Sequence, residues 1–209
     1  DRIPFYTRGE PREGLVVREM LATGEWLVPA RPGGELARKP PLYYWAAALA
    51  LRAFPDTPER ALRLPSAAFA TAAVVGTWAT ARAAFGPAAG LPAALVLASA
   101  FEWTRAATSA RVDMTLAGAM TAVLAGWTLA LVRGRAWWVL AAAGAALGTL
   151  AKGPIALVLP ALAAIALGFA ERGRGVVRQL RPLAVLGTAA ATAGVWYALA
   201  LVRQGSAFA

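Results

Sequence analysis

The chain has 209 residues, 59% of them hydrophobic, and its mean hydropathy of +0.55 is typical of a membrane protein and not of a soluble domain. The formal charge of +10 does not indicate a nucleic-acid partner, because the basic residues lie at the ends of apolar segments and not on one solvated face. Since cysteine and histidine are absent, disulfides, thiolate metal sites and a histidine base are excluded, and acid–base chemistry falls to carboxylates, Lys, Tyr or Arg.

The N-terminal region, residues 1–61, carries most of the charge and predicts an extracytoplasmic loop with juxtamembrane helices. Pro11 suits the first turn of a helix, Glu10 would cap that helix, and Gly24 would end it. Apolar residues recur on one face of this stretch, so we expect an amphipathic helix over residues 11–23.

A second short helix is predicted after a loop rich in Pro and Gly. The prolines of RKPPLYYW, residues 38–45, would start it. It is too short to span a bilayer, and its first turn carries Tyr43, Tyr44 and Trp45. We interpret these aromatic side chains as lying at the level of the lipid headgroups.

The rest of the chain, residues 62–209, alternates apolar runs with brief charged breaks and predicts an all-α, polytopic transmembrane helix bundle. Six spans are expected: 62–84, 87–102, 113–132, 136–150, 154–170 and 182–202. Two of them, around LAAAGAALGTLA and TAAATAGVWYALA, are rich in Ala and Gly, which permits close helix contacts.

The arginines between the spans predict the orientation of the bundle. With the N-terminal module outside, the cytoplasmic ends of the spans hold Arg82, Arg133, Arg135, Arg172, Arg174, Arg178 and Arg181. The opposite ends hold fewer cations, as the positive-inside rule requires.

The ionisable residues on the outer side are few, and they would gather in one zone. They are Glu10, Arg12, Arg38, Lys39, Glu102, Arg105, Arg111, Asp113 and Lys152. Ionisable groups are costly near a membrane, so such clustering favours a functional site. Arg60 and Arg63 are interpreted instead as surface or interface charges without a chemical role.

Each of the main candidates also has a purely structural interpretation. Asp113 would serve as the N-cap of the helix that it precedes, and Glu10 would cap the first helix. Lys152 ends a predicted helix, where cations are favoured, and Arg38 and Lys39 would anchor the chain at the interface.

Carboxylates beside Arg and Lys would nevertheless bind a phosphorylated ligand and a hydroxyl group, which suits transfer from a lipid phosphate.

One rival interpretation is a membrane transporter or lipid flippase, which predicts an inverted repeat and charge deep within the spans. No internal repeat is visible. A noncatalytic membrane scaffold is a third interpretation.

Five motifs, in this order, carry a resemblance across almost the whole chain: GEPREGLVVREMLATGEWLVP, RKPPLYYW, RLPSA, ARVDM and LAKGPIALVLP. Together they resemble membrane glycosyltransferases of the GT-C fold, in the bacterial branch related to protein O-mannosyltransferases and to lipid A aminoarabinose transferases. The resemblance implies an enzyme of the bacterial plasma (inner) membrane with its active site on the extracytoplasmic face. It would move a sugar, with inversion, from a polyprenyl-phosphate donor to a lipid, glycan or protein hydroxyl.

The site residues follow from the same resemblance. Glu10 and Asp113 match the acidic residues of two outer loops and are the candidate catalytic carboxylates. The resemblance assigns binding of the donor phosphate to Lys39 of KPP and Lys152 of KGP, assisted by Arg12 and Arg111.

The chain departs from the family at two positions. Gly9 stands where relatives often have Asp, so Glu10 would substitute for it or Asp113 would serve. Arg38 replaces an acidic residue that helps relatives hold a divalent metal. Because the chain has no histidine, the kind of metal site that the sequence still allows is a Mg²⁺ or Mn²⁺ site with oxygen ligands. Relatives begin with a spanning helix and continue with further spans, so we expect this chain to be an internal piece.

Overall fold

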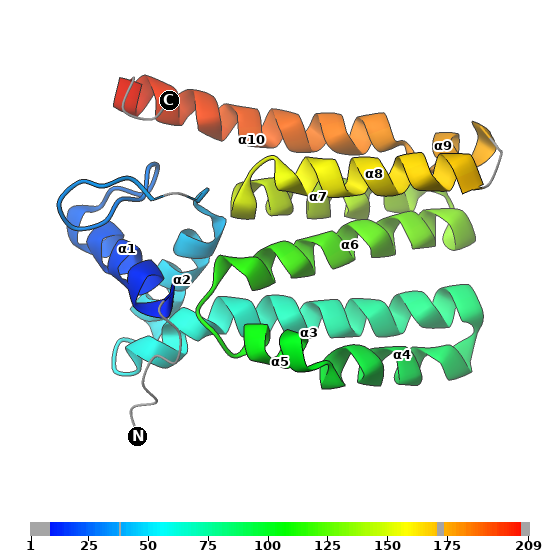
Figure 1. Cartoon of the computed structure of the whole chain (residues 1–209), viewed down its shortest axis with the longest axis horizontal. Coiled ribbons are helices and arrows are strands. Elements are labelled where there is room, and N and C mark those ends of the chain that lie inside the picture. Colours follow the sequence, from blue (N-terminus) through cyan, green and yellow to red (C-terminus); the bar gives the residue numbers. More distant parts are fainter. Residues whose placement is uncertain (1–8, 38, 171–173, 206–209) are drawn as a thin grey trace.

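The computed structural model describes residues 9–37, 39–170 and 174–205, and within them the chain is almost entirely helical (Figure 1). The helices are α1 (Gly9–Thr23), α2 (Leu42–Ala53), α3 (Pro58–Phe85), α4 (Pro87–Ser99), α5 (Phe101–Ala107), α6 (Val112–Arg133), η1 (Arg135–Trp137), α7 (Trp138–Lys152), α8 (Ile155–Ala170), α9 (Arg174–Leu180) and α10 (Pro182–Gln204). The expected all-α class is confirmed.

The long helices α3, α4, α6, α7, α8 and α10 lie roughly side by side, and the chain runs up and down between the two ends of this bundle (Figure 1). At one end, α1 and α2 form a separate module. The starts of α3 and α6 and the end of α7 face this module, whereas α6 ends and α7 begins at the far end. The far end therefore carries Arg133, Arg135 and Arg181, in line with the predicted sorting of arginines.

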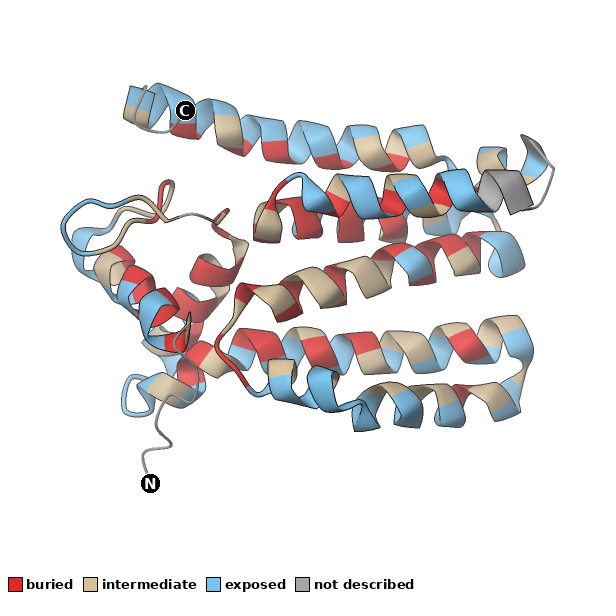
Figure 2. Cartoon of the chain, in the orientation of Figure 1, coloured by how far each residue is buried: buried red, intermediate tan, exposed pale blue. Residues whose placement is uncertain are grey.

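Three helical segments are long and apolar enough to cross a membrane: Pro58–Phe85, Val112–Arg133 and Gly175–Gln204. The outer surfaces of α4 and α10 are exposed in Figure 2, and many side chains there are apolar. Leu183 and Val202 are 84% and 87% exposed, which in water would be unfavourable and in lipid is favourable. The chain is thus a polytopic membrane protein. The six spans and the division at residue 61 stay predictions.

The N-terminal module contains both helices predicted for it, but its aromatic side chains lie differently. Tyr43 and Tyr44 are 0% and 2% exposed. The Tyr43 hydroxyl donates to the carbonyl of Leu62 at 2.8 Å, and Val17 and Met20 of α1 pack in the same core. The interpretation of these tyrosines as a headgroup belt is therefore wrong. They join α1 and α2 to the start of α3.

The loop between α1 and α2 is held against the end of α10. The indole N–H of Trp196 donates to the carbonyl of Leu27 at 2.8 Å, and Arg203 donates to Glu25 at 3.3 Å. Burial raises the pKa of the Glu25 carboxyl, but the N–H groups of Val28 and Leu27 and the Arg203 guanidinium outweigh it and hold that pKa below its usual value. These contacts fix the module from a second side.

The predicted close helix contacts occur between α6 and α7. A Cβ placed on Gly144 of α7 would lie 2.7 Å from the carbonyl oxygen of Ala119 on α6. By contrast, a Cβ on Gly194 of α10, in the other Ala-rich span, would meet no atom within 4 Å. Close packing through glycine is thus a property of the first of these two spans.

This difference predicts opposite effects for two Gly→Ala substitutions. We expect Gly144→Ala to destabilise the protein by about 1–3 kcal/mol, because the added methyl group forces α6 and α7 apart. Gly194→Ala should stabilise it by about 0.5–1 kcal/mol, because alanine is the better helix former and the site is open. Unfolding of the detergent-solubilised variants by SDS measures both. Equal effects would contradict the packing argument.

Candidate functional site

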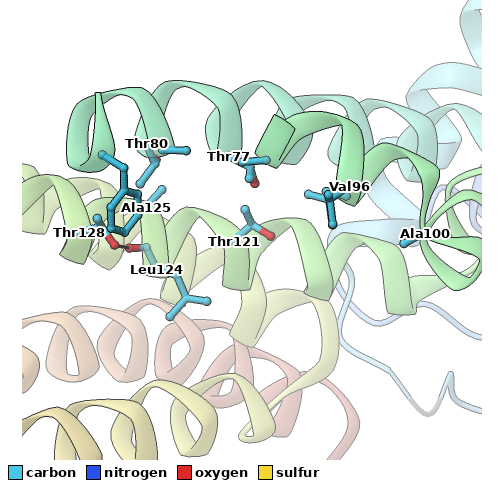
Figure 3. A pocket seen from close by; sticks show the side chains of 12 residues that line it. Thr77, Thr80, Val96, Ala100, Thr121, Leu124, Ala125 and Thr128 are labelled. Carbon is cyan, nitrogen blue, oxygen red and sulfur yellow. Dashed lines mark hydrogen bonds between the residues drawn. The ribbon is translucent and has the colours of Figure 1, made fainter. Parts of the chain in front are cut away.

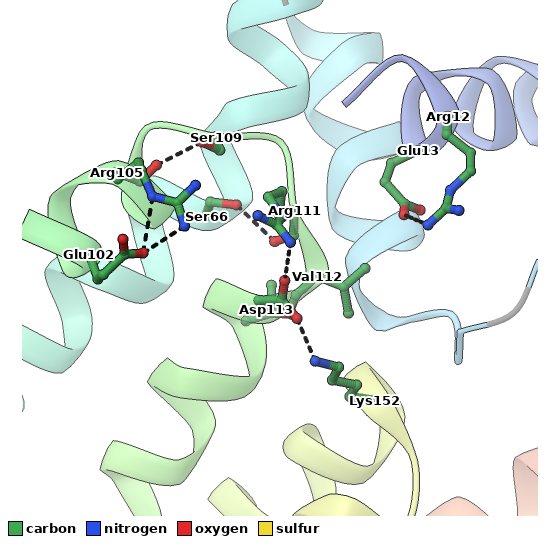
Figure 4. A network of polar contacts seen from close by, with 11 residues as sticks. Arg12, Glu13, Ser66, Glu102, Arg105, Ser109, Arg111, Val112, Asp113 and Lys152 are labelled. Carbon is green, nitrogen blue, oxygen red and sulfur yellow. Dashed lines mark hydrogen bonds and ion pairs between the residues drawn. The ribbon is translucent and has the colours of Figure 1, made fainter. Parts of the chain in front are cut away.

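A polar cavity of about 280 Å³ lies where the N-terminal module meets the bundle. It is lined by Gly9, Arg12, Glu13, Lys39, Arg111, Val112, Asp113 and Lys152. Figure 4 shows Arg12 and Glu13 of α1 on one side and Arg111, Asp113 and Lys152 on the other. Five of the six predicted site residues therefore line one cavity, although they come from four separate parts of the chain.

Asp113 is the centre of the bundle side of this cavity. Its Oδ2 forms an ion pair with Arg111 at 2.9 Å, and its Oδ1 accepts a hydrogen bond from Lys152 at 2.5 Å. The helix α6 begins at Val112, after Arg111 in extended backbone, and no side chain caps it. The N-cap interpretation of Asp113 is therefore wrong, and its carboxylate is free to hold two cations.

Lys152 reaches Asp113 because the helix α7 ends on it. The next residue, Gly153, has a φ of 76°, and Pro154 follows it. This backbone favours glycine and stops the helix, so the last side chain projects from the end of the bundle. The predicted helix end at Lys152 is confirmed.

Glu10 does not line the cavity. Its carboxylate is buried beside it, where Oε1 accepts hydrogen bonds from Arg63 Nε and from the backbone N–H of Ala110, both at 2.9 Å. Glu10 also lies within α1 and does not precede it. The Arg63 side chain is 11% exposed, so its interpretation as a surface charge is wrong, whereas Arg60 is exposed as expected.

Glu13 lines the cavity but was not a predicted site residue. It is 8% exposed, and its Oε2 accepts a hydrogen bond from the Tyr44 hydroxyl at 2.6 Å. A signal for it exists in the sequence, since Glu13, Val16, Val17 and Met20 follow helical spacing and α1 buries all four. A carboxylate at the head of an apolar stripe indicates a buried, partnered group.

The balance of charge around the cavity favours an anion. Four cationic side chains and two carboxylates line it, which leaves a formal charge of +2. Lys39 supplies one of the four cations from the loop before α2, whereas Arg38 lies outside the described residues. A phosphate group matches this charge and the hydrogen-bond donors of Lys and Arg.

The described residues contain no group of three or more Asp or Glu side chains placed to hold a metal ion. A divalent cation of the Mg²⁺ or Mn²⁺ type thus stays a prediction.

Two neighbouring features differ from this site. A larger cavity of about 580 Å³, between α3, α4 and α6, is lined by apolar residues and threonines and by no ionisable side chain (Figure 3). Glu102 and Arg105 pair with each other at 2.6 Å on the surface, with exposures of 71% and 44%. The apolar cavity adds no charge to the site, whereas Glu102 and Arg105 line, together with Arg111 and Asp113, an adjacent cavity of about 320 Å³.

Comparisons with known proteins agree with this arrangement. The family profile described as dolichyl-phosphate-mannose-protein mannosyltransferase matches residues 38–198. The chain is 30% identical over 184 residues to the undecaprenyl phosphate-alpha-4-amino-4-deoxy-L-arabinose arabinosyl transferase of Edwardsiella ictaluri (strain 93-146), covering 85% of this chain and 33% of that protein.

Two crystal structures of ArnT from Cupriavidus metallidurans have the same fold. The apo structure has a TM-score of 0.88 and 28% identity, covering 97% of this chain and 39% of that chain. The structure bound to undecaprenyl phosphate has a TM-score of 0.89 and 27% identity, covering 99% and 39%. This chain thus spans well under half the length of these relatives.

Proposed function

Because the chain belongs to the dolichyl-phosphate-mannose-protein mannosyltransferase family, we propose that it transfers a sugar from a polyprenyl-phosphate donor to an acceptor hydroxyl. The resemblance that the motifs indicate is confirmed by this family. The observation that carries the proposal is the cavity with a formal charge of +2 at one end of a membrane bundle. ArnT from Cupriavidus metallidurans, which has a similar fold, has been crystallised bound to undecaprenyl phosphate.

The cations of the cavity stabilise the leaving group. When the bond between the anomeric carbon and the phosphate oxygen breaks, its electron pair stays on that oxygen and the phosphate gains a negative charge. Lys39, Lys152, Arg12 and Arg111 meet this added charge. Fixed cations that face developing charge stabilise a transition state more than the ground state. A single displacement by the acceptor inverts the anomeric carbon.

The two predicted carboxylates have different positions and therefore different proposed roles. Asp113 orients Lys152 and Arg111 toward the phosphate, because it contacts both. Glu10 positions the start of α1 through Arg63 and Ala110, and its burial keeps it from the substrate.

The proposed location is the bacterial inner membrane, with the cavity on the extracytoplasmic face. The arginines at the far end of the bundle support this orientation by the positive-inside rule. A transporter would place charge deep within the spans. Here Asp113 and Lys152 lie in the first turn of α6 and the last turn of α7, which favours the transferase.

Binding and consumption of the donor by the full-length protein test this function. We expect isolated membranes, which supply the acceptor, to consume an undecaprenyl phosphate-linked sugar, and EDTA to report any need for a divalent cation. Lys152→Met should weaken binding of undecaprenyl phosphate about tenfold or more, because a charged hydrogen bond contributes about 1.5–3 kcal/mol. Arg60→Met, which removes an exposed cation at the same end of the bundle, is the matched control. If no donor is bound or consumed, the transporter or scaffold replaces the proposal.

A further inference from the structure

We infer that Glu13 is the general base that takes the proton of the acceptor hydroxyl. This inference rests on the proposed function and adds a group that the sequence motifs did not assign. Among the described residues, the carboxylates that line the cavity are Glu13 and Asp113.

Asp113 holds a cation with each of its two oxygens. One of its oxygens contacts Arg111 and the other contacts Lys152. Two cations on one carboxylate strongly favour its charged form, so it is a poor proton acceptor. Glu10 is buried against Arg63 and does not line the cavity. Glu13 is the carboxylate that remains.

The two oxygens of Glu13 have different surroundings. Oε2 accepts the hydrogen bond of Tyr44, whereas the nearest cation to Oε1 is Arg12, whose Nη2 lies 3.7 Å away, beyond hydrogen-bond distance. Oε1 is thus able to accept a further proton. Tyr44 fixes the Oε2 side of the carboxylate, and Glu13 lines the cavity beside Arg12, the ion-pair partner of Oε1.

Tyr44 keeps this carboxylate oriented. Burial, and then the charge of Glu13, raise the pKa of the Tyr44 hydroxyl far above its usual value, so the hydroxyl stays protonated and donates. A base held by a third group is the arrangement that activates nucleophiles in many transferases and hydrolases. Tyr44 is accordingly a positioning residue.

The transfer balances with Glu13 in this role. The acceptor oxygen forms a bond to the anomeric carbon and loses its proton to Glu13 Oε1. The bond from the anomeric carbon to the phosphate oxygen breaks, and its electron pair leaves with the phosphate. The products are the glycosylated acceptor, polyprenyl phosphate and a neutral Glu13, which returns its proton to water.

Glu13→Gln tests the role directly, because glutamine can still accept the hydrogen bond of Tyr44 but cannot act as a base. We expect kcat in membranes to fall about a hundredfold or more, which is the scale of general-base catalysis. Binding of undecaprenyl phosphate and the thermal unfolding of the purified protein should change little. Tyr44→Phe should lower kcat less. Glu19→Gln, on the same helix but outside the lining of the cavity, is the matched control.

A rescue variant separates chemistry from packing. Gly9 lies one helical turn before Glu13, lines the same cavity, and has no atom within 4 Å of an added Cβ. Gly9→Asp in the Glu13→Gln background should restore part of the lost kcat, because it returns a carboxylate to the cavity. Gly9→Asp alone is the control: if Glu13 is merely structural, Gly9→Asp should change kcat by the same factor with and without Glu13→Gln.

The outcomes are distinct. If the wild type consumes donor and Glu13→Gln does so at a rate within about threefold, the assignment of the base is wrong and the transferase stands. If kcat falls only in proportion to a loss of folded protein, and Gly9→Asp changes kcat equally with and without Glu13→Gln, Glu13 is a packing residue. If the wild type neither binds nor consumes any donor, both proposals fail together.

Discussion

Asp113→Asn is expected to lower turnover about 10²–10³-fold while the protein stays folded, which is the scale of losing a fixed electrostatic contact to a transition state. The carboxylate holds Lys152 with one oxygen and Arg111 with the other. An asparagine offers one oxygen and turns its NH₂ group toward the second cation. The two cations then separate from each other by repulsion, and the phosphate loses its prepared contacts.

Turnover in membranes and binding of undecaprenyl phosphate to the purified variant measure this effect. Glu35→Gln is the control, because Glu35 also pairs with an arginine, Arg31, in the N-terminal module but is exposed and does not line the cavity. It should behave as the wild type. Unchanged turnover in Asp113→Asn would remove Asp113 from the site.

Much of the fold follows from the order of apolar and charged residues. The apolar runs predicted the helices of the bundle within a few residues, and α1 begins two residues before the expected position. The break at GP after Lys152 and the prolines before Leu42 set helix ends locally, so a single sequence carries this information. The ends of these helices can therefore be predicted from neighbouring residues alone.

The cavity was predictable in part for a related reason. In a chain that runs up and down, the start of one span and the end of the next lie on the same side of the membrane. Asp113 and Lys152 occupy two such positions, so they were expected on the same side. Their contact is seen in Figure 4. The side of the membrane that the cavity faces is inferred only from the distribution of the arginines, because the arrangement of the helices is the same in either orientation.

The errors concern groups whose partners lie far away in sequence. Arg63 pairs with Glu10 across 53 residues, and Glu10 accepts from Ala110 across 100. Tyr43 and Tyr44 are amphipathic, and the same side chain suits a headgroup region or a module core. Pattern rules assign such residues to an interface, since nothing local shows that another helix covers them.

Arg63→Gln is expected to destabilise the N-terminal module by about 3–5 kcal/mol, because it removes the guanidinium that lies 2.9 Å from the buried Glu10 carboxylate. The Glu10 side chain is 1% exposed, so water cannot replace the guanidinium. Glu10→Gln should cost less than Arg63→Gln, because the amide oxygen keeps the hydrogen bond from Ala110 and Arg63 lies nearer to solvent.

The double variant carries the decisive comparison. If the pair acts as one unit, Glu10→Gln with Arg63→Gln is less destabilised than the sum of the single variants, because both charges of the ion pair are removed together. Proteolysis of the outer module in detergent, compared with SDS unfolding of the whole protein, shows where the loss falls. Protection should drop first in α1, which would move Arg12 and Glu13 away from the cavity and lower turnover in the same order of variants. Additive effects would mean that Glu10 and Arg63 stabilise the module separately, and that α1 is placed by its apolar core alone.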